Sequence, residues 1–338
     1  MHAPASRPSS TWLRRVVSSP RLGALILVAS VVAGCGAGTD ASSAPASQDP
    51  SAAAPDPSAL VASFPMTVVD DEGTSVEIAA RPERVVSLTP GTTEILFAIG
   101  AGDRVVGTTD ADDYPPEAVP LPDVASFGSV DLERLVELEP DVVLAGGNFF
   151  TPPEAIDGLR DLGIPVVVIY AATVDAVVED VELVGAVVGL SAEAAEVAST
   201  MRAEIAAITQ AVGDAPRPRV FYEIDASAGL FGPADESFLA EMIELAGGEP
   251  ITTGSATSFE MDIERLVAMD PEVIVLGDVA FGVTPDHVAT RPAWGGLTAV
   301  RERAVRGVDD KLVTRPGPRL PLGLRSLTLA IHPDARLP

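Results

Sequence analysis

The 338-residue sequence has little of several residue types on which common functional sites depend. Its single cysteine excludes an intramolecular disulfide and a cysteine-rich metal site. Only two of its three histidines, His287 and His332, lie beyond the first 34 residues, too few for a multi-histidine zinc site. Only 22 Lys and Arg stand against 49 Asp and Glu, which gives a net charge of −27. This balance argues against a nucleic-acid binder and against a polybasic membrane-surface protein, because both need clustered cations.

Near the N-terminus an apolar run of about eleven residues, 22–32, follows a segment with four arginines and no acid. A membrane-spanning helix needs roughly 20 apolar residues, so this run fits a signal peptide better. Small residues lead directly into Cys35. They resemble the lipobox of bacterial lipoproteins, which implies cleavage before Cys35, lipid attachment to it and an anchor outside the cytoplasm. A plain secretory signal is the alternative, and Arg14-Arg15 leaves Sec and twin-arginine export both open.

The rest of the chain divides by composition into a tether and a folded part. Residues 35–63 are dominated by small residues, Pro and Asp without periodicity, so they are expected to be a disordered tether behind the 1–34 signal peptide. Hydrophobic residues make up 47% of the sequence, enough for a sizeable core. A hairpin is expected over 67–78, where β-branched runs flank a Gly-containing turn.

Strands and helices are then expected to alternate, a pattern typical of a mostly parallel sheet covered on both faces. Two consecutive helices interrupt this order at 174–212, with Gly189 as the C-cap of the first and Ser191 as the cap of the second. A strand at 219–224 resumes the alternation. The expected strands of the first part are 84–88, 103–107, 141–145 and 165–170, and its helices lie at 89–99, from 132 and at 153–162.

An internal repeat is the most informative feature of the sequence. The stretch DLERLVELEPDVVL at 131–144 returns as DIERLVAMDPEVIV at 262–275, an offset of 131 residues without a gap. Each copy predicts a short helix, a proline that ends it and a strand. A generic helix–strand unit could supply the apolar positions, but matched Asp, Glu, Arg and Pro in one register favour a structural duplication.

The chain resembles the class III solute-binding lipoproteins of ABC importers, which deliver vitamin B12, haem or iron–siderophore complexes. The resemblance covers about residues 64–335 and rests on RPERVVSLTP from Arg81, DYPPE from Asp113, the two repeat units, LAGG from Leu245 and RPAW ending at Trp294. It implies two doubly wound α/β lobes joined by a long, stiff helix at 192–212, with a ligand held between them. We therefore expect an N-terminal lobe at 64–173, a helical connection at 174–216 and a C-terminal lobe at 217–338, in a monomer.

Loops that follow strands supply the candidate ligand contacts, because ligands of open α/β sheets sit beyond the carboxyl ends of the strands. Only 4% of the chain is aromatic, so aromatic residues in such loops are informative. Local packing is the alternative for each. Phe127 stands where the vitamin B12 binders often have Trp, and Glu223 and Asp225 add polar groups. The full set of candidates is Tyr114, Phe127, Phe149, Phe150, Glu223, Asp225, Phe231, Phe281 and Trp294.

The ligand itself stays open at this point. The expected groove is not obviously basic, which disfavours tri-anionic catecholate chelates and leaves cobalamin and neutral ferric hydroxamates. Haem is the alternative ligand, and Tyr114 or His287 could then serve as its axial ligand. The chelate would be cargo, so we expect no resident cofactor and no metal bound by the protein itself.

The repeat glutamates suggest a second role. In the resembled family one surface Glu on each lobe pairs with Arg on the permease, and Glu133 and Glu264 match those positions. Duplicated acids would suit a partner with two-fold symmetry, and charge complementarity orients such encounters. The alternative is a local ion pair of each glutamate with the adjacent Arg134 or Arg265.

Motifs of common enzyme classes are missing. The sequence has no GxGxxG phosphate loop, no GxSxG nucleophile elbow and no HExxH zinc motif. We therefore expect a binding protein and not an enzyme. A secreted hydrolase using His287 or His332, and an adhesion or structural lipoprotein, are the competing hypotheses.

Overall fold

The computed structural model describes residues 63–147 and 150–338. The predicted signal peptide, Cys35, the tether up to residue 62 and Phe149 lie outside the described residues. The described part begins with the expected hairpin, in which β1 (Met66–Val69) pairs antiparallel with β2 (Ser75–Ile78). The Asp70 carboxylate accepts the N–H groups of Glu72 and Thr74 at 3.1 and 2.7 Å and thereby fixes the turn.

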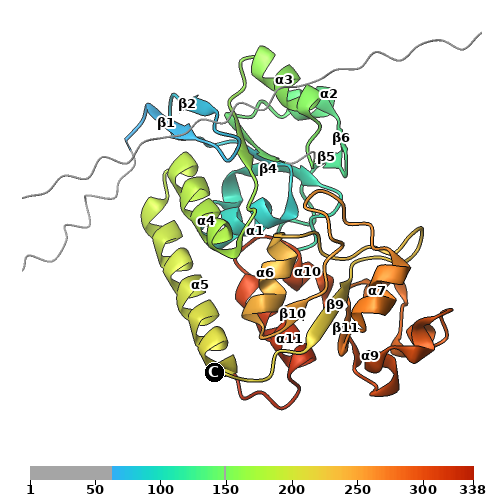
Figure 1. Ribbon diagram of the computed structural model, residues 1–338. Coiled ribbons are helices and arrows are strands. Elements are labelled where there is room, and N and C mark those ends of the chain that lie inside the picture. Colours follow the sequence, from blue (N-terminus) through green and yellow to red (C-terminus); the bar gives the residue numbers. More distant parts are fainter. Residues whose placement is uncertain (1–62, 148–149) are drawn as a thin grey trace, which may run out of the picture. The chain divides into compact units, whose positions relative to one another are not determined.

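Six strands form the first sheet, in the order β6-β5-β4-β3-β7-β8 (Figure 1). All neighbouring strands are parallel except β5 and β6. Strands β7 and β8 are buried along their whole length, as expected for parallel strands with helices on both sides. The strands are β3 (Val85–Ser87), β4 (Val105–Thr109), β5 (Asp123–Ser126), β6 (Ser129–Val130), β7 (Val142–Gly146) and β8 (Val166–Ile169).

Helices cover both faces of this sheet. One face packs against α1 (Pro90–Ala98) and α4 (Val174–Val188), and the other packs against α2 (Leu132–Glu137) and α3 (Pro153–Asp161). A 3-10 turn, η2 (Gly102–Arg104), leads into β4. The alternation of strands and helices predicted from the sequence is confirmed except between β4 and α2, where the strands β5 and β6 were not predicted.

The two consecutive helices are α4 and α5 (Ser191–Val212). Gly189 ends α4 with φ +71°, as expected for a C-cap glycine. The prediction for Ser191 is wrong: Leu190 is the N-cap of α5, and no side chain caps this helix. The helices meet closely, because a Cβ on Gly185 would lie 2.2 Å from the Ala194 side chain.

The second sheet has four parallel strands in the order β10-β9-β11-β12. They are β9 (Arg219–Glu223), β10 (Glu249–Pro250), β11 (Val273–Leu276) and β12 (Val305–Gly307). The helices α6 (Phe238–Leu245) and α11 (Leu320–Ile331) pack on one face, and α7 (Ile263–Met269), α8 (Pro285–Ala289) and α9 (Thr298–Arg301) pack on the other. Shorter pieces are η3 (Asp278–Phe281), η4 (Trp294–Gly296) and α10 (Asp310–Val313).

One hydrophobic core is shared by the two sheets. It runs from the α1–α4 face of the first sheet through α5 to the α6–α11 face of the second sheet. The interlobe helix α5 packs against α4 on one side and α11 on the other (Figure 1). The predicted fold, two parallel α/β units joined by a long helix, is confirmed. The limits of the N-terminal lobe (64–173), the helical connection (174–216) and the C-terminal lobe (217–338) stay predictions.

The internal repeat is also a structural repeat. Asp131 and Asp262 both cap their helices, because each carboxylate accepts a backbone N–H of the first turn. The residues before the two prolines, Glu139 and Asp270, both have φ +45°. A positive φ is uncommon for residues other than glycine, so its recurrence at matching positions supports duplication.

An arginine at the start of the first strand of each half completes the match. Arg84 donates to the carbonyls of Leu138 and Glu139 at the end of α2, with its Nε at 2.9 and 3.1 Å. Arg219 donates to the carbonyls of Met269 and Asp270 at the end of α7, with its Nε at 3.0 and 3.2 Å. Each arginine thus satisfies the free carbonyls of a repeat helix.

Candidate functional site

The carboxyl ends of the parallel strands bring the loops of each sheet to one edge. In the first sheet, Thr89 follows β3, Asp110–Tyr114 follow β4 and Phe150 follows β7. In the second sheet, Asp225 follows β9, Asp278 follows β11 and Lys311 follows β12. The sequence therefore places most of the candidate residues at these two edges.

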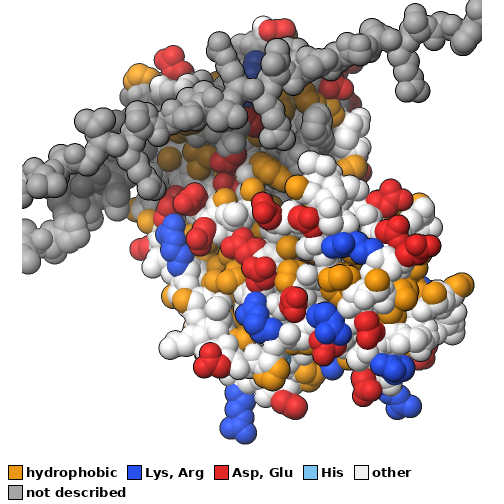
Figure 2. All heavy atoms as spheres, in the orientation of Figure 1, with side chains coloured by type: hydrophobic (Ala, Val, Ile, Leu, Met, Phe, Trp, Pro, Cys, Tyr) orange, Lys and Arg blue, Asp and Glu red, His pale blue; other side chains and the backbone are white. Residues whose placement is uncertain are grey.

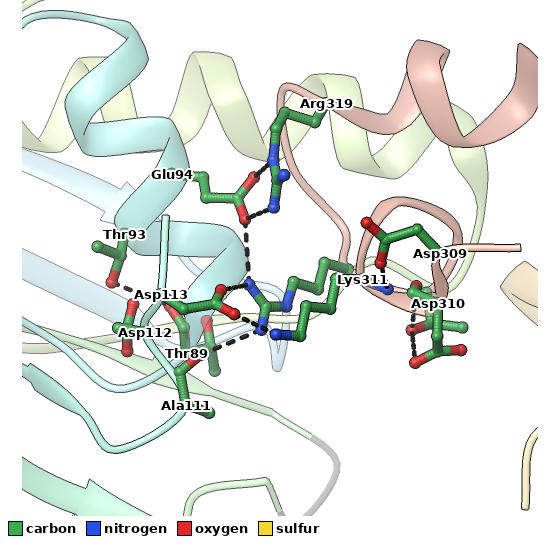
Figure 3. A network of polar contacts seen from close by, with 12 residues as sticks. Thr89, Thr93, Glu94, Ala111, Asp112, Asp113, Asp309, Asp310, Lys311 and Arg319 are labelled. Atoms are coloured by element: carbon green, nitrogen blue, oxygen red, sulfur yellow. Dashed lines mark hydrogen bonds and ion pairs between the residues drawn. The ribbon is translucent and has the colours of Figure 1, made fainter. Parts of the chain in front are cut away.

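Ion pairs join the two edges directly (Figure 3). Lys311 Nζ binds one carboxylate oxygen of Asp113, and Arg315 binds the other at 2.7 Å. Arg315 also donates to the Ala111 carbonyl at 3.1 Å. Burial raises the pKa of Asp113, but the hydrogen bonds and charges of Lys311 and Arg315 outweigh it and hold that pKa below its ordinary value.

A second set of contacts lies beside the first. Glu94, in α1, is only 2% exposed, and Arg319 donates to both of its carboxylate oxygens at 2.7 and 2.5 Å. Arg315 approaches the same carboxylate at 3.5 Å. The hydrogen bond to Glu94 raises the pKa of Arg319. This bidentate geometry is what a buried carboxylate needs to remain charged.

Backbone contact reinforces the junction between the two halves. A Cβ on Gly91, in the first turn of α1, would lie 2.2 Å from the carbonyl oxygen of Pro316, so only glycine fits there without a shift. A Cβ on Gly317 would in turn lie 3.1 Å from the Gly91 carbonyl oxygen. The loop between α10 and α11 therefore rests on the start of α1.

Exposed aromatic side chains stand on the first-sheet side. Phe127 is 87% exposed and meets Phe150 edge to face, with ring centroids 5.9 Å apart and an interplanar angle of 85°. Tyr114 is also exposed, and the Arg319 guanidinium lies 4.0 Å from its ring centroid. The structure thus brings Phe127 and Phe150 together and places Tyr114 beside the ion pairs.

The second-sheet candidates are more varied. Phe281 is exposed at the end of η3. Phe231 is half-buried and forms single β-bridges with Asp225 and Glu260. Asp225 accepts the N–H and the hydroxyl of Ser227 at 3.1 and 2.9 Å, so its carboxylate already holds its own turn.

Two candidates require correction, because they are buried within the second half. Trp294 is 4% exposed and packs in the core between the second sheet and α7–α9, with the Arg291 guanidinium 4.7 Å from its ring centroid. Glu223 is fully buried and binds Arg291 through both carboxylate oxygens at 2.5 and 2.8 Å. Glu223 therefore has no exposed surface to offer a ligand, and Trp294 keeps only a small exposed fraction, at a shallow hollow of about 260 Å³ that it helps to line.

The buried Glu223 has a further neighbour at the end of β11. Burial, and then the charge of Glu223 and a hydrogen bond with it, raise the pKa of Asp278 to about 6. One oxygen of the Asp278 carboxylate has no hydrogen-bond partner in the described part of the chain. Asp278 therefore keeps its proton up to about pH 6, beside the Glu223–Arg291 pair.

Sequence reasoning missed several residues at the edges. Glu94, Lys311, Arg315 and Arg319 carry the contacts between the two halves, yet no local pattern marks any of them. Phe259 is exposed shortly before the second repeat helix, as Phe127 is before the first. Adding the repeat offset of 131 residues to Phe127 gives position 258, one residue before Phe259, so the repeat could have pointed to this side chain.

The proposed docking acids lie on the repeat helices, Glu133 in α2 and Glu264 in α7. Glu133 and Glu264 are both exposed. Among the described residues neither carboxylate takes part in an ion pair, so the expected alternative of a local pair with Arg134 or Arg265 is not seen. Arg265 instead donates to the Thr252 carbonyl at 2.9 Å.

The histidines named in the competing hypotheses lie in the second half. His287 is exposed on α8, and His332 has its Nε2 3.1 Å from the Gly247 carbonyl oxygen. In the stretches 63–147 and 150–338, no group of three or more His, Cys, Asp or Glu is arranged to hold a metal ion. None of the described helices is long and apolar enough to cross a bilayer.

Comparison with known proteins places the chain. A family model described as periplasmic binding protein matches residues 85–312. The uncharacterized ABC transporter substrate-binding lipoprotein YvrC of Bacillus subtilis (strain 168) is 31% identical over 316 residues, which cover 92% of this chain and 96% of that protein. A cobalamin-binding protein of Halobacterium salinarum is 32% identical over 282 residues, covering 80% of this chain and 75% of that one.

Solved structures agree with this placement. The periplasmic vitamin B12-binding protein BtuF of Vibrio cholerae superposes with a TM-score of 0.66 at 25% sequence identity, and the match covers 74% of this chain and 97% of the BtuF chain. The periplasmic haem-binding protein RhuT from Roseiflexus sp. RS-1 gives a TM-score of 0.66 at 28% sequence identity, and the match covers 75% of this chain and 99% of the RhuT chain. The resemblance drawn from the sequence is confirmed, and the chain belongs to the periplasmic binding protein family.

Proposed function

We propose that this protein is the substrate-binding component of an ABC importer and that it captures cobalamin between the carboxyl edges of its two sheets. Relatives named as cobalamin- or vitamin B12-binding proteins match most of the chain, which supports this ligand. The exposed aromatic group of Tyr114, Phe127 and Phe150 would supply contact area for a flat, bulky macrocycle. Phe231, Phe281 and Asp225 would contact it from the second half, and Phe149 remains a candidate on sequence grounds.

The observation that carries the choice of ligand is the charge balance at the junction. All three cations there, Lys311, Arg315 and Arg319, are already paired with the two acids Asp113 and Glu94. A tri-anionic catecholate, or the two propionates of haem, would have to displace these acids and leave a carboxylate unpaired. The neutral amide rim of a corrinoid can instead accept and donate hydrogen bonds without breaking the pairs.

A ligand panel tests this proposal. The purified protein is heated with cyanocobalamin, haem or a ferric hydroxamate, each at about 100 times the dissociation constant under test. A ligand that binds only the folded state then stabilises it by about 2.7 kcal/mol. We expect a shift of the unfolding midpoint with cyanocobalamin and not with the other two. A shift with haem alone would support the haem alternative and contradict the cobalamin assignment.

The proposal includes docking on the permease through Glu133 and Glu264. Both carboxylates are exposed and free of ion pairs in the described structure, so each is available to an arginine of a partner subunit. The double variant Glu133→Ala, Glu264→Ala is expected to abolish uptake of labelled cyanocobalamin while leaving its affinity unchanged. Glu137→Ala, an exposed acid on the same helix as Glu133, is the matched control. Uptake by the double variant at the control rate would disprove the docking role.

The proposal also includes export and lipid attachment at Cys35, with the folded part outside the cytoplasm as a monomer. The lipobox-like sequence before Cys35 and the lipoprotein relative in Bacillus subtilis support it. Cells fed labelled palmitate should label the parent protein, and Cys35→Ala should remain unlabelled and appear in the medium. Membrane-held protein without label would contradict the anchor. We propose no resident cofactor and no catalytic activity, since the family binds and delivers its cargo.

A further inference from the structure

The ion pairs between the two halves form a row that runs from the shared core to the solvent (Figure 3). At the inner end the buried Glu94 binds Arg319. Arg315 follows, 3.5 Å from the Glu94 carboxylate and 2.7 Å from that of Asp113. At the outer end Lys311 and Asp113, termed the outer pair, bind each other with side chains that are 49% and 43% exposed. The row therefore joins the halves firmly at one end and loosely at the other.

The inner end of this row has little freedom. The start of α1 rests on the loop before α11, since a Cβ on Gly91 would lie 2.2 Å from the carbonyl oxygen of Pro316. Separating Glu94 from Arg319 would leave a buried charge without its partner, which is strongly unfavourable. The outer pair is exposed, and an exposed ion pair is weak and is screened by salt. When the two carboxyl edges move apart, the outer pair is thus the first contact to break.

Both members of the outer pair stand on braced backbone. The residue before its acid, Asp112, is buried and accepts the N–H and the hydroxyl of Thr109 at 2.8 and 2.6 Å. The residue before its lysine, Asp310, accepts the hydroxyl of the fully buried Tyr222 at 2.9 Å. Each brace lies within one half, so neither loop yields easily when the halves separate. The separation is therefore taken up by the outer pair itself.

We propose that the outer pair is a latch on the movement of the two halves: it opens and closes while the inner contacts stay intact, and it sets how often the carboxyl edges separate. The inference rests on the proposed function, because a ligand held between these edges would enter and leave only when they part. A latch that holds the free and the ligand-bound protein closed to the same extent slows entry and exit by the same factor. It therefore changes both rate constants and leaves the dissociation constant unchanged, whereas a residue that contacts the ligand changes the dissociation constant.

The latch can be observed without a ligand, because Lys311 is the only lysine of the sequence. The purified full-length protein is treated with the N-hydroxysuccinimide ester of acetic acid, and acetylation of Lys311 is followed by mass spectrometry. In dilute buffer we expect Asp113→Asn to react about fivefold faster than the parent, since an exposed ion pair contributes up to about this factor. In about 1 M sodium chloride, where the screening length is about 3 Å, the two proteins should react alike. Equal rates in dilute buffer, or a difference that persists in high salt, overturn the latch.

Ligand kinetics test the consequence of the latch. We expect Lys311→Gln to raise the association and dissociation rate constants for cyanocobalamin about fivefold each in dilute buffer and to leave their ratio unchanged. Arg202→Gln is the matched control, because it breaks a pair with Glu182 whose side chains have the same exposed fractions, 49% and 43%. Its rate constants should equal those of the parent. A change in only one rate constant of Lys311→Gln, or in neither, contradicts the latch.

Covalent closure is the converse test. A carbodiimide couples the Lys311 amine to the paired Asp113 carboxylate as an amide, and the oxygen that the carboxylate loses leaves in the urea formed from the reagent. The coupled protein should take up and release cyanocobalamin far more slowly than the parent, while Asp113→Asn treated in the same way should not be slowed. Exchange by the coupled protein at the parent rate overturns the latch. If cyanocobalamin fails to bind the untreated parent while acetylation depends on salt as expected, the proposed ligand is wrong and the latch stands.

Discussion

Arg319 donates to both carboxylate oxygens of Glu94, although 225 residues separate the two in the sequence. The pair joins the start of α11 to α1, the helix that follows the first strand of the first sheet. Because Glu94 is nearly fully buried, water cannot replace the guanidinium. This contact, with the Lys311–Asp113 and Arg315–Asp113 pairs beside it, holds the carboxyl edges of the two sheets toward each other.

Removing this guanidinium should be costly. We expect Arg319→Ala to lower the free energy of unfolding by about 3 kcal/mol, because it leaves a buried carboxylate with Arg315 alone. The control is Arg202→Ala, which breaks an exposed pair with Glu182 and should cost at most about 1 kcal/mol. Urea denaturation measures both. Equal losses in the two variants would show that the buried pair has no special role.

A second pair of acids makes stability depend on pH. Asp71 lies in the β1–β2 turn and Asp180 in α4, and their carboxyl groups are hydrogen-bonded. Burial, followed by the charge of Asp71 and the bond with it, raises the pKa of Asp180 to about 8. Between about pH 4 and pH 8 the folded chain holds a proton that the unfolded chain has released. The free energy of unfolding therefore falls as the pH rises through this range.

Asp180→Asn should remove that dependence, because the amide imitates the protonated acid. We expect the variant to differ little from the parent near pH 4 and to exceed it in stability by a margin that grows with pH, up to about 5 kcal/mol at pH 8 as an upper bound. Asp175→Asn, at an exposed position of the same helix, is the control. Denaturation at a series of pH values measures the effect. Parallel pH profiles for parent and Asp180→Asn would contradict the shared proton.

The duplicated caps allow a test of additivity. Asp131→Ala and Asp262→Ala should each lower the free energy of unfolding by about 1 kcal/mol, since each removes the side-chain cap of a repeat helix. The caps share no contact, so the double variant should lose the sum. Chemical denaturation of the three variants suffices. If one of the two single substitutions leaves the free energy of unfolding unchanged, the two repeat helices are not equivalent.

How far the sequence could lead is clear from the arginines Arg84 and Arg219. The gapless repeat at 131–144 and 262–275 revealed the duplicated helix and strand because all its contacts are local. The two arginines perform the same task in both halves, but they lie 135 residues apart and not 131, so no gapless comparison pairs them. Only the structure shows their common role, because in it each side chain donates hydrogen bonds to the carbonyls that end α2 or α7.

The candidate site shows the same limit. Phe127 and Phe150 were recognisable because loops that follow parallel strands meet at one edge. The predictions for Trp294 and Glu223 are wrong because a position after a strand does not reveal burial. Arg291 contacts both side chains, and it is near Trp294 but 68 residues from Glu223 in the sequence. Glu94 could be read only as an acid in a helix, since its partner is distant in sequence. Local sequence patterns predicted the helices and strands. The ion pairs between the two halves could not be predicted in this way, because their partners are distant in sequence and meet only in the folded protein.

The aromatic pair gives the ligand proposal a direct mutational test. We expect Phe127→Ala and Phe150→Ala each to weaken cyanocobalamin binding about tenfold, because each removes a ring that would stack on or against the macrocycle. Leu162→Ala removes an exposed apolar side chain after α3 and should leave the affinity unchanged. Equilibrium dialysis with labelled cyanocobalamin gives the constants. Unchanged affinity in both phenylalanine variants would remove these rings from the site.

Calorimetric titration of the purified protein with cyanocobalamin tests the central claim, that the two carboxyl edges together hold one corrinoid. We predict saturable binding of one ligand per chain with a dissociation constant in the micromolar range or tighter. A titration without saturable heat, from folded protein that does saturate with haem or a ferric hydroxamate, would contradict it.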